Sequence, residues 1–543
     1  MATSARAVSD MPQPYALLLR VQVPATAAVR FNDPMGNPRA STVDGVLRRS
    51  AGRTPDRVAL TYAERSWTYA ELDAAVSRAA GHLLSLGLDR GDRVATVGAN
   101  SDAYLLAFLG CARAGLVHVP VNHALTGGEL SYLLAQSGSR VALVDPALRA
   151  GVEKVQGETG LEQVLTLHGD ADNGAGAVLD TWRDGPVPEF DVDVADTDLV
   201  QLLYTSGTTS KPKGAMMTHR ALVHEYVSTV HALDMAETDD PLHCMPLYHS
   251  AGMHVFLLPY LAVGATNRLM TRPDVPEILR VIETERAGAL FLAPTVWVPL
   301  SNADDFATRD LSSLRKAFYG ASIMPVPVLQ RLQKRLPDLA FYNCFGQSEI
   351  APLATVLRPE EHEERPESCG RPVLFVEIRV VDVEGNDVDP DVPGELLYRS
   401  PQLCTGYWQD DAATAEAFRD GWFHSGDLVR RDAAGYLTVV DRIKDVINTG
   451  GVLVASREVE DALYTHPAVA EVTVVATPDE RWIEAVTAVV VLRPGAPATE
   501  AELIGHARGS LAPFKVPKRV HFVDELPRNQ SGKLLKRVLR DQL

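Results

Sequence analysis

Strand-like and helix-like segments alternate over two long stretches of the chain, from about residue 55 to 150 and from about 198 to 350. This alternation is typical of βαβ units, so it predicts mostly parallel sheets covered by helices. Thr68 and Glu71 form the capping-box pattern that begins a helix. The elements predicted in the first stretch are helices at 69–86 and 104–114 and strands at 94–97 and 116–121.

The pattern changes after residue 370. Short β-rich pieces separated by Gly, Asp and Pro fill 370–440 and indicate a small β-barrel or an antiparallel sheet. An α+β pattern then returns, with helices at 458–464 and 501–511 and strands at 472–476 and 485–492. We therefore expect an α/β fold with a large N-terminal domain over 1–441, in which mixed parallel sheets with helices adjoin the β-rich subdomain. A small α+β C-terminal domain should cover 442–543, since 543 residues exceed a single core.

Composition excludes several classes of protein. The net charge of −18 argues against a nucleic-acid-binding protein, which needs a basic surface. The five cysteines are scattered without a Cys-x-x-Cys pair, which indicates reduced thiols and no zinc site. No apolar run reaches the ~20 residues of a membrane span, and residues 1–40 lack the pattern of a signal peptide. These observations predict a cytoplasmic protein without a membrane span.

Residues 204–214 are rich in hydroxyls, glycine and lysine. They follow an apolar strand-like run at 199–204 and precede a helical pattern near Thr218. Loops of this composition are usually solvated connectors, but a loop between a strand and a helix can also wrap a phosphate chain. It is not a Walker A loop, because Lys213 is followed by Gly and Ala. The loop therefore predicts a site for a nucleotide triphosphate.

Four further segments carry candidate chemistry, and each also has an ordinary structural interpretation. Glu349 could hold Mg²⁺ on a phosphate, or end a strand in solvent. Asp427 could accept the ribose hydroxyls, or belong to a common Ser-Gly-Asp turn. Residues 441–451 combine charge with two glycines, as a hinge or a solvated linker would. Lys533 follows a small flexible turn, and a lone lysine is usually a surface residue.

Taken in order, these segments resemble the adenylate-forming superfamily of acyl-CoA synthetases, peptide-synthetase adenylation domains and luciferases. The resemblance runs from about Arg53 to Arg537, and 205–214 is similar to the family signature Thr-Ser-Gly-Thr-Thr-Gly-x-Pro-Lys-Gly. It implies a small C-terminal domain that rotates between two half-reactions. A carboxylate first attacks the α-phosphate of ATP and gives an acyl-adenylate and pyrophosphate. A thiol, usually that of coenzyme A, then takes the acyl group and releases AMP.

The resemblance also assigns roles to single residues. Lys533 would bridge the acid and the α-phosphate, and His249, within the motif at 246–252, would lie beside the acyl site. A lone histidine would otherwise be a core residue more often than not. Glu349 and Thr205 would hold Mg²⁺. The implied ATP- and AMP-binding residues are Thr205, Ser206, Gly207, Thr208, Thr209, Lys213, Gly320, Ala321, Ser322, Asn343, Phe345, Gly346, Ser348, Asp427 and Arg442.

The residues that would bind the acid and the thiol are less clearly marked in the sequence. By resemblance, Lys444 is the hinge, and Gly450, Gly451, Phe514 and Lys515 contact coenzyme A. The predicted acyl pocket contains Tyr248, Ser250, Gly252 and Val296. Its small residues leave room for a bulky apolar acid, which we expect to be fatty, aryl or polycyclic. The implied cofactors are ATP, Mg²⁺ and coenzyme A.

The chain departs from the family pattern after the two glycines, where Val-Leu-Val-Ala-Ser at 452–456 replaces the usual Glu-Asn-Val-Tyr-Pro. Ser210, Ser348, Phe345 and Ser425 are milder departures, and most keep a hydroxyl. The chain could therefore favour one half-reaction and depend on an upstream adenylating enzyme, or it could load a carrier protein. A kinase or ATPase, a nucleotide sensor and a homodimer also stay open at this point.

Overall fold

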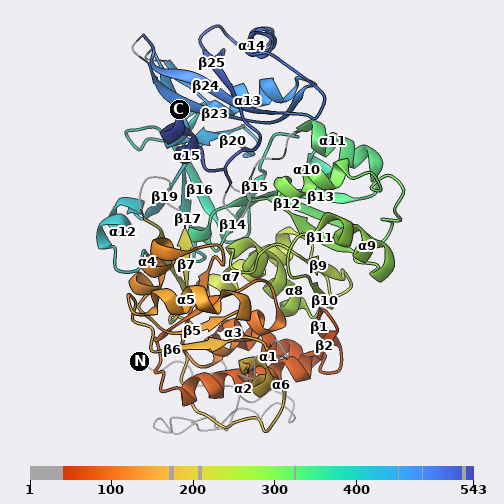
Figure 1. Ribbon diagram of the computed structural model, residues 1–543, viewed down its shortest axis with the longest axis vertical. Helices are drawn as coiled ribbons and strands as arrows, with labels where there is room; N and C mark the ends of the chain where they lie inside the picture. Colours follow the sequence, from red (N-terminus) through yellow and green to blue (C-terminus); the bar gives the residue numbers. More distant parts are fainter. Residues whose placement is uncertain are drawn as a thin grey trace, which may run out of the picture.

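The computed structural model describes residues 41–169, 177–205, 211–322, 324, 326–450, 452–479, 481–528 and 534–543 (Figure 1). Ser206, Gly207, Thr208, Thr209, Ser210, Gly451 and Lys533 lie outside these ranges, as does the arm over residues 1–40. Four sheets organise the described chain. The α/β fold expected from the sequence is confirmed.

A six-stranded sheet contains the strands of the first stretch in which strands and helices alternate. Its order is β6-β5-β3-β4-β7-β8, and all its pairs are parallel except the last. Its strands are β3 (Arg93–Val97), β4 (Val117–Val121), β5 (Ser139–Val144), β6 (Gln163–Thr166), β7 (Leu199–Thr205) and β8 (Lys213–Thr218). Its connecting helices include α3 (Asp102–Arg113), α4 (Gly127–Ser137), α5 (Arg149–Gln156) and α6 (Val178–Arg183). The predicted βαβ alternation is confirmed.

Helix α2 (Tyr69–Ser85) shows why the local prediction succeeded. The hydroxyl of Thr68 accepts from the backbone N–H of Glu71 at 3.2 Å, and the Glu71 carboxylate accepts from the backbone N–H of Thr68 at 2.8 Å. Both bonds satisfy donors that the first helical turn would leave unpaired. Helix α1 (Val43–Arg53) lies beside α2 (Figure 1).

A nine-stranded sheet carries the second alternating stretch, in the order β15-β14-β13-β12-β11-β9-β10-β1-β2. Its strands are β1 (Val58–Tyr62), β2 (Arg65–Thr68), β9 (Pro241–His243), β10 (Asn267–Leu269), β11 (Ala289–Leu292), β12 (Lys316–Gly320), β13 (Ala340–Gly346), β14 (Leu353–Leu357) and β15 (Arg371–Pro372). Its helices are α7 (His219–Ala232), α8 (Leu258–Val263), α9 (Val275–Glu285), α10 (Pro294–Asn302) and α11 (Val326–Arg335). Neighbouring strands from β13 to β1 are parallel, so their carboxyl ends meet at one edge.

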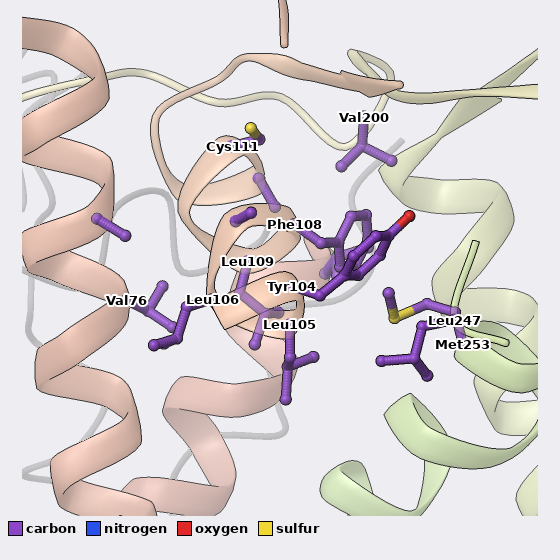
Figure 2. Packing of buried hydrophobic residues seen from close by; sticks show 14 of the residues in the cluster. Val76, Tyr104, Leu105, Leu106, Phe108, Leu109, Cys111, Val200, Leu247 and Met253 are labelled. Carbon is purple, nitrogen blue, oxygen red and sulfur yellow. The ribbon is translucent and has the colours of Figure 1, made fainter. Parts of the chain in front are cut away.

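Helix α3 lies at the centre of the largest hydrophobic cluster, and every residue of it is buried. Tyr104, Phe108 and Leu106 project from it toward different neighbours, among them Val76 of α2 (Figure 2). Leu247 and Met253, from the segment after β9, pack on the same cluster. Truncating a buried leucine here, such as Leu106, costs about 2–5 kcal/mol of stability. The core therefore reaches the segment that carries the predicted acyl motif.

The region at 370–440 forms an antiparallel sheet, as the sequence predicts. Its strands are β16 (Glu377–Val381), β17 (Gly394–Arg399), β18 (Phe418–Arg419), β19 (Trp422–Arg431) and β20 (Leu437–Arg442), with helix α12 (Asp411–Ala417) beside them. Within the described residues, β16 remains an edge strand, so these pairings form an open sheet and not a closed ring of strands.

The last sheet consists of strands that follow residue 446, in the order β22-β21-β24-β23 with β25 on β24. The strands are β21 (Ile447–Thr449), β22 (Val452–Val454), β23 (Val469–Asp479), β24 (Ile483–Leu492) and β25 (Arg519–Phe522). The helices are α13 (Ser456–Tyr464), α14 (Glu500–Arg508) and α15 (Lys536–Gln542). This α+β unit lies at one end of the molecule (Figure 1).

Two further expectations concern chemistry and environment. All five cysteines are free and buried: Cys111, Cys244, Cys344, Cys369 and Cys404. Burial raises the pKa of every one of these thiols. In the described part of the chain, no helix is long and apolar enough to cross a membrane.

Candidate active site

The candidate site lies at the carboxyl edge of the nine-stranded sheet. Strands β9, β11, β12 and β13 are parallel neighbours there. The segments that follow them carry the predicted site residues: His249 and Ser250 after β9, Val296 after β11, Ala321 and Ser322 after β12, and Ser348 and Glu349 after β13. Ligands of open α/β sheets bind outside the carboxyl ends of the strands. The topology therefore gathers residues that are about a hundred positions apart.

The predicted adenine walls lie side by side. Gly320 pairs with Cys344 across β12 and β13, so 320–322 run along 343–345. A Cβ at Gly320 would overlap the carbonyl oxygen of Cys344, so only glycine fits there. Ala321 has φ +64, which turns the chain at the end of β12. Asn343 donates its side-chain amide to the Ser368 carbonyl at 2.9 Å, which fixes that side chain.

The predicted acyl motif forms a turn that leads into η2 (Ala251–Leu257), a stretch of π-helix. Gly252 is required there, because a Cβ would lie 2.6 Å from the Pro246 carbonyl oxygen. The rings of Tyr248 and His249 lie 4.6 Å apart. Stretches of π-helix are frequently found at functional sites. The turn thus presents the small residues that the sequence analysis placed in the acyl pocket.

A hydrogen bond joins the acyl motif to the adenylate segment. The hydroxyls of Ser250 and Ser348 lie 2.9 Å apart, although the two residues are far apart in sequence. Val296 lies in the first turn of α10 and packs on the hydrophobic cluster that includes Trp297. These contacts place the acyl and nucleotide candidates in one region.

The phosphate loop differs from its prediction. It connects two antiparallel strands, β7 and β8, with Thr205 paired to Lys213, and it does not lead directly into a helix. Helix α7 begins only at His219, after its N-cap Thr218. Strand β8 therefore separates the loop from the N-terminus of α7 in the chain. Residues 213–218, Lys-Gly-Ala-Met-Met-Thr, show no alternation of polar and apolar side chains, so no local pattern indicated this strand.

Glu349 lies in the 3-10 turn η3 (Ser348–Ile350), which is in contact with both β7 and β8. Its side chain is buried, and Oε1 accepts a hydrogen bond from the Tyr407 hydroxyl at 3.1 Å. No group of three or more metal-ligating side chains gathers among the described residues. A lone carboxylate near the phosphate hairpin suits Mg²⁺, which takes one or two carboxylates and otherwise phosphate oxygens and water.

The predicted ribose residues form an ion pair. Asp427 of β19 and Arg442 at the end of β20 are cross-strand partners, and Arg442 Nε lies 2.6 Å from Asp427 Oδ1. Burial opposes the charged guanidinium, but the carboxylates of Asp427 and Glu349 keep the pKa of Arg442 above its ordinary value. Asp427 is 2% exposed. The pair therefore presents an oriented acceptor and an oriented donor within one β-ladder.

The predicted hinge is held at both ends. Lys444 lies exposed in the 3-10 turn η5 (Ile443–Asp445). Before it, Asp441 Oδ2 accepts from the backbone N–H and hydroxyl of Ser456 at 2.6 and 2.8 Å. After it, Arg540 of α15 lies 2.5 Å from Asp445. The Asp441–Ser456 bonds span the turn, so they join the end of β20 to the start of α13 in this arrangement.

The residues predicted to contact coenzyme A lie in the last unit. Gly450 has φ +65 and donates its N–H to the Trp482 carbonyl at 2.6 Å. Phe514 is 37% exposed, and Lys515 pairs with Glu458 at 2.5 Å. Leu453 of β22, directly after the two glycines, is 69% exposed. The structure supports an accessible surface here, while Gly451 lies outside the described ranges.

Comparison with known proteins agrees with this arrangement. The AMP-binding enzyme family matches residues 47–408, and the AMP-binding enzyme C-terminal domain matches 458–533. Feruloyl-CoA synthase of an Amycolatopsis species is 38% identical over 492 residues, which is 91% of this chain and 97% of that protein. Indoleacetate–CoA ligase of Aromatoleum aromaticum is 34% identical over 492 residues, which is 90% of this chain and 96% of that protein.

A solved structure supports the same assignment. The anthranilate CoA ligase AuaEII, in complex with anthranoyl-AMP, matches with a TM-score of 0.86 and 26% identity. The match covers 93% of this chain and 98% of that one. The agreement extends over both units of the fold. The chain therefore belongs to the AMP-binding enzymes of the adenylate-forming superfamily and is an acyl-CoA synthetase, an AMP-forming acid–thiol ligase.

Proposed function

We propose that this enzyme converts a bulky apolar carboxylic acid to its coenzyme A thioester through an acyl-adenylate. One observation carries the proposal: the acyl motif, the adenine walls and Glu349 converge at one edge of parallel strands, joined by the 2.9 Å hydrogen bond between Ser250 and Ser348. The acid and the α-phosphate must meet within a few ångströms, and this convergence supplies a place for both.

Each group would have one task in the first step. Lys213 and the hydroxyls of the phosphate loop would bind the β- and γ-phosphates, and Glu349 with Thr205 would hold Mg²⁺. Asp427 and Arg442 would orient the ribose. Lys533, as expected from the sequence, would place positive charge where the acid attacks the α-phosphate, since preorganised charge is most effective where charge develops.

The acid should be large and flat or long. Ser250, Gly252 and Gly346 are small, and Tyr248 and Val296 supply apolar surface. The named relatives act on feruloyl and indoleacetate groups, and the solved neighbour on anthranilate. We therefore favour aryl acids within the wider class of fatty, aryl and polycyclic acids.

A panel of acids tests this function. The protein is incubated with ATP, Mg²⁺, coenzyme A and one acid at a time: ferulate, indoleacetate, anthranilate, a medium-chain fatty acid, a polycyclic propanoate, and acetate as the small control. Mass spectrometry then detects AMP and the thioester. We expect both products with at least one bulky acid and far less with acetate. ADP and inorganic phosphate in place of AMP and pyrophosphate would exclude the proposal.

A second candidate concerns the thiol. The exposed β22, with Val452 at 45% and Leu453 at 69%, replaces the polar residues usual in this family. The enzyme could therefore use a carrier protein as acceptor, or be efficient in one half-reaction only. Supplying acid with ATP, and separately acyl-adenylate with coenzyme A, distinguishes these cases. Equal rates in both assays would exclude specialisation for one half-reaction.

A further inference from the structure

Tyr407 lies between two groups to which the proposed function gives charged roles. Its hydroxyl donates to Oε1 of Glu349 at 3.1 Å. The Nζ atom of Lys213 lies over its ring, 5.3 Å from the ring centroid. The side chain is 8% exposed. The sequence analysis did not select this residue, because nothing local marks a tyrosine in a loop as functional. Its importance appears only when chain segments about sixty and two hundred positions away are placed beside it.

The backbone around Tyr407 is fixed to the phosphate hairpin. Tyr407 forms an isolated antiparallel β-bridge with Ala215 of β8, with Met216 N–H donating to the Gly406 carbonyl at 2.9 Å and Trp408 N–H to the Gly214 carbonyl at 2.8 Å. The N–H of Tyr407 itself donates to the Thr414 hydroxyl at 2.9 Å. Tyr407 therefore cannot move independently of the strand that begins at Lys213.

The charges around the ring are of opposite sign. Lys213 approaches the face of the ring, where the negative quadrupole attracts a cation. Glu349 accepts from the hydroxyl at the edge of the same ring. Within the described part of the chain, Lys213 forms no ion pair with a carboxylate. Tyr407 thus contacts the Lys213 ammonium through its ring and the Glu349 carboxylate through its hydroxyl, and these two charged groups do not pair with each other.

The hydroxyl is suited to remain a donor. The carboxylate oxygen of Glu349 accepts, so the Tyr407 hydroxyl is the donor of the 3.1 Å hydrogen bond between them. No hydrogen bond from the described residues reaches Oε2 of Glu349. One carboxylate oxygen is therefore oriented by the protein, while the other can take a cation. Outer partners of this kind commonly set metal affinity by orienting the ligand.

We propose that Tyr407 is a positioning residue for the magnesium nucleotide: it keeps Glu349 for the metal and Lys213 for the phosphates by holding the two side chains apart. This inference rests on the proposed function, in which Glu349 binds Mg²⁺ on ATP. Without the hydroxyl, the carboxylate loses its fixed orientation and can turn toward the ammonium group of Lys213. Both groups would then be less available to the nucleotide.

Equilibrium binding tests this role apart from turnover. Calorimetry measures the affinity of the wild-type protein and of Tyr407→Phe for ATP over a range of Mg²⁺ concentrations, and separately for AMP without metal. We expect Y407F to need about 10-fold or more Mg²⁺ for half-saturation with ATP, the usual size of such second-layer effects. Its affinity for AMP should be unchanged. In a Glu349→Gln background, Y407F should add no further loss.

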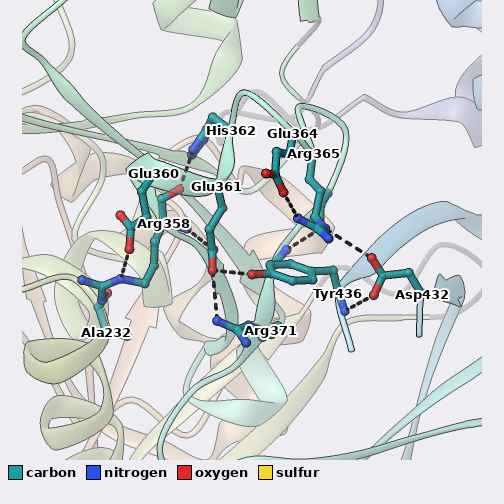
Figure 3. A network of polar contacts seen from close by, with 12 residues as sticks. Ala232, Arg358, Glu360, Glu361, His362, Glu364, Arg365, Arg371, Asp432 and Tyr436 are labelled. Carbon is teal, nitrogen blue, oxygen red and sulfur yellow. Dashed lines mark hydrogen bonds and ion pairs between the residues drawn. The ribbon is translucent and has the colours of Figure 1, made fainter. Parts of the chain in front are cut away.

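Tyr436 offers a matched control. It also donates to a glutamate, Glu361, at 2.6 Å, and Arg365 and Arg371 lie over its ring at 4.2 and 4.6 Å (Figure 3). This tyrosine–glutamate pair has the same chemistry but lies outside the proposed nucleotide site. Tyr436→Phe should therefore leave the Mg²⁺ dependence of ATP binding at the wild-type value.

Several results would overturn the inference. The first is a Mg²⁺ dependence of ATP binding in Y407F that equals that of the wild type. The second is a loss of AMP affinity as large as the loss of ATP affinity, which would indicate a general structural role. If Y407F does not fold, Tyr407→His, which retains a ring with a donor, carries the test and should show a smaller shift in the same direction. If the wild-type protein itself binds ATP without any Mg²⁺ dependence, the role of Tyr407 fails, whereas the panel of acids tests the proposed function separately through AMP and thioester formation.

Discussion

Gly320 is a single residue on which the geometry of the adenine wall depends. Its Cα lies so close to the Cys344 carbonyl that β12 and β13 would separate if a side chain were added. Gly320→Ala should therefore lower stability by about 1–3 kcal/mol through overpacking and weaken AMP binding. Thermal unfolding and calorimetry with AMP measure the two effects.

Gly505 in α14 is the matching control, since nothing lies within 4 Å of a Cβ built there. Gly505→Ala should stabilise the protein by about 0.5–1 kcal/mol, because alanine restricts the unfolded chain and favours the helix. A Gly320→Ala variant as stable as the wild type would show that the two strands can separate without cost.

Single candidate residues could be selected from the sequence wherever a local motif indicates their chemistry. Glu349, Asp427 and Lys213 belong to short segments with a recognisable order. Tyr407 could not be found in this way, because its two partners come from other parts of the chain. Asp427 was predicted to bind the ribose and Arg442 the ribose or a phosphate, and the structure adds that the two form one ion pair.

At the scale of elements, a chain of buried polar side chains joins three strands, a π-helical turn and α7. From Thr96 to Tyr226 it runs through His118, Gln201 and His254, with distances of 2.7–3.1 Å. Both histidines are 0% exposed. This chain of hydrogen bonds positions η2, which carries Gly252, by linking it to the six-stranded sheet. A polar group that is buried this deeply destabilises the fold if it loses a hydrogen-bond partner.

These histidines predict a pH dependence of stability. Burial lowers the pKa of His118 and of His254 to about 3, so the folded protein keeps them neutral while the unfolded chain protonates them below pH ~6.5. Stability should fall as the pH decreases from 6.5 toward 3, by up to ~1.4 kcal/mol per pH unit for each histidine.

Denaturant unfolding between pH 5 and 7.5 measures this slope in the wild type and in His254→Gln. We expect the slope to be smaller in the variant by about the contribution of one histidine. His231→Gln, at an exposed position of helix α7, which packs against η2, should keep the wild-type slope. An unchanged slope in His254→Gln would show that the buried site tolerates the proton.

Elements were predictable where the pattern is local and long. The capping box of α2 and the βαβ alternation are of this kind. Strand β8 was missed because it is short, contains a glycine, and is fixed by its pairing with β7. The π-helical stretch η2 was not predicted, and the close approach of Gly252 to the Pro246 carbonyl within it appears only in the folded structure.

At the scale of the whole molecule, the two half-reactions should depend on different parts of the chain. We expect Lys533→Ala to reduce adenylate formation by ~10²–10³, because the lysine would act on charge that develops only in that step. Thioester formation from supplied acyl-adenylate should stay within a few-fold of the wild type. Single-turnover assays of each step measure both rates.

Arg537→Ala is the control on the same basic tail, since Arg537 is largely exposed and, among the described residues, pairs with Asp541 of its own helix. It should leave both steps unchanged. Equal losses of both half-reactions in Lys533→Ala would contradict the separation of roles.

The burial of all five cysteines has a practical consequence for chemistry at sulfur. The thiolate is the reactive form, and these thiols are both inaccessible and held protonated. The native protein should therefore show no reaction with Ellman's reagent, and all five thiols should appear in denaturant. Ellman's reagent could then measure the consumption of the coenzyme A thiol continuously, because the protein itself would give no signal. A cysteine introduced at the exposed Leu453 would be the one site at which a spectroscopic probe attaches.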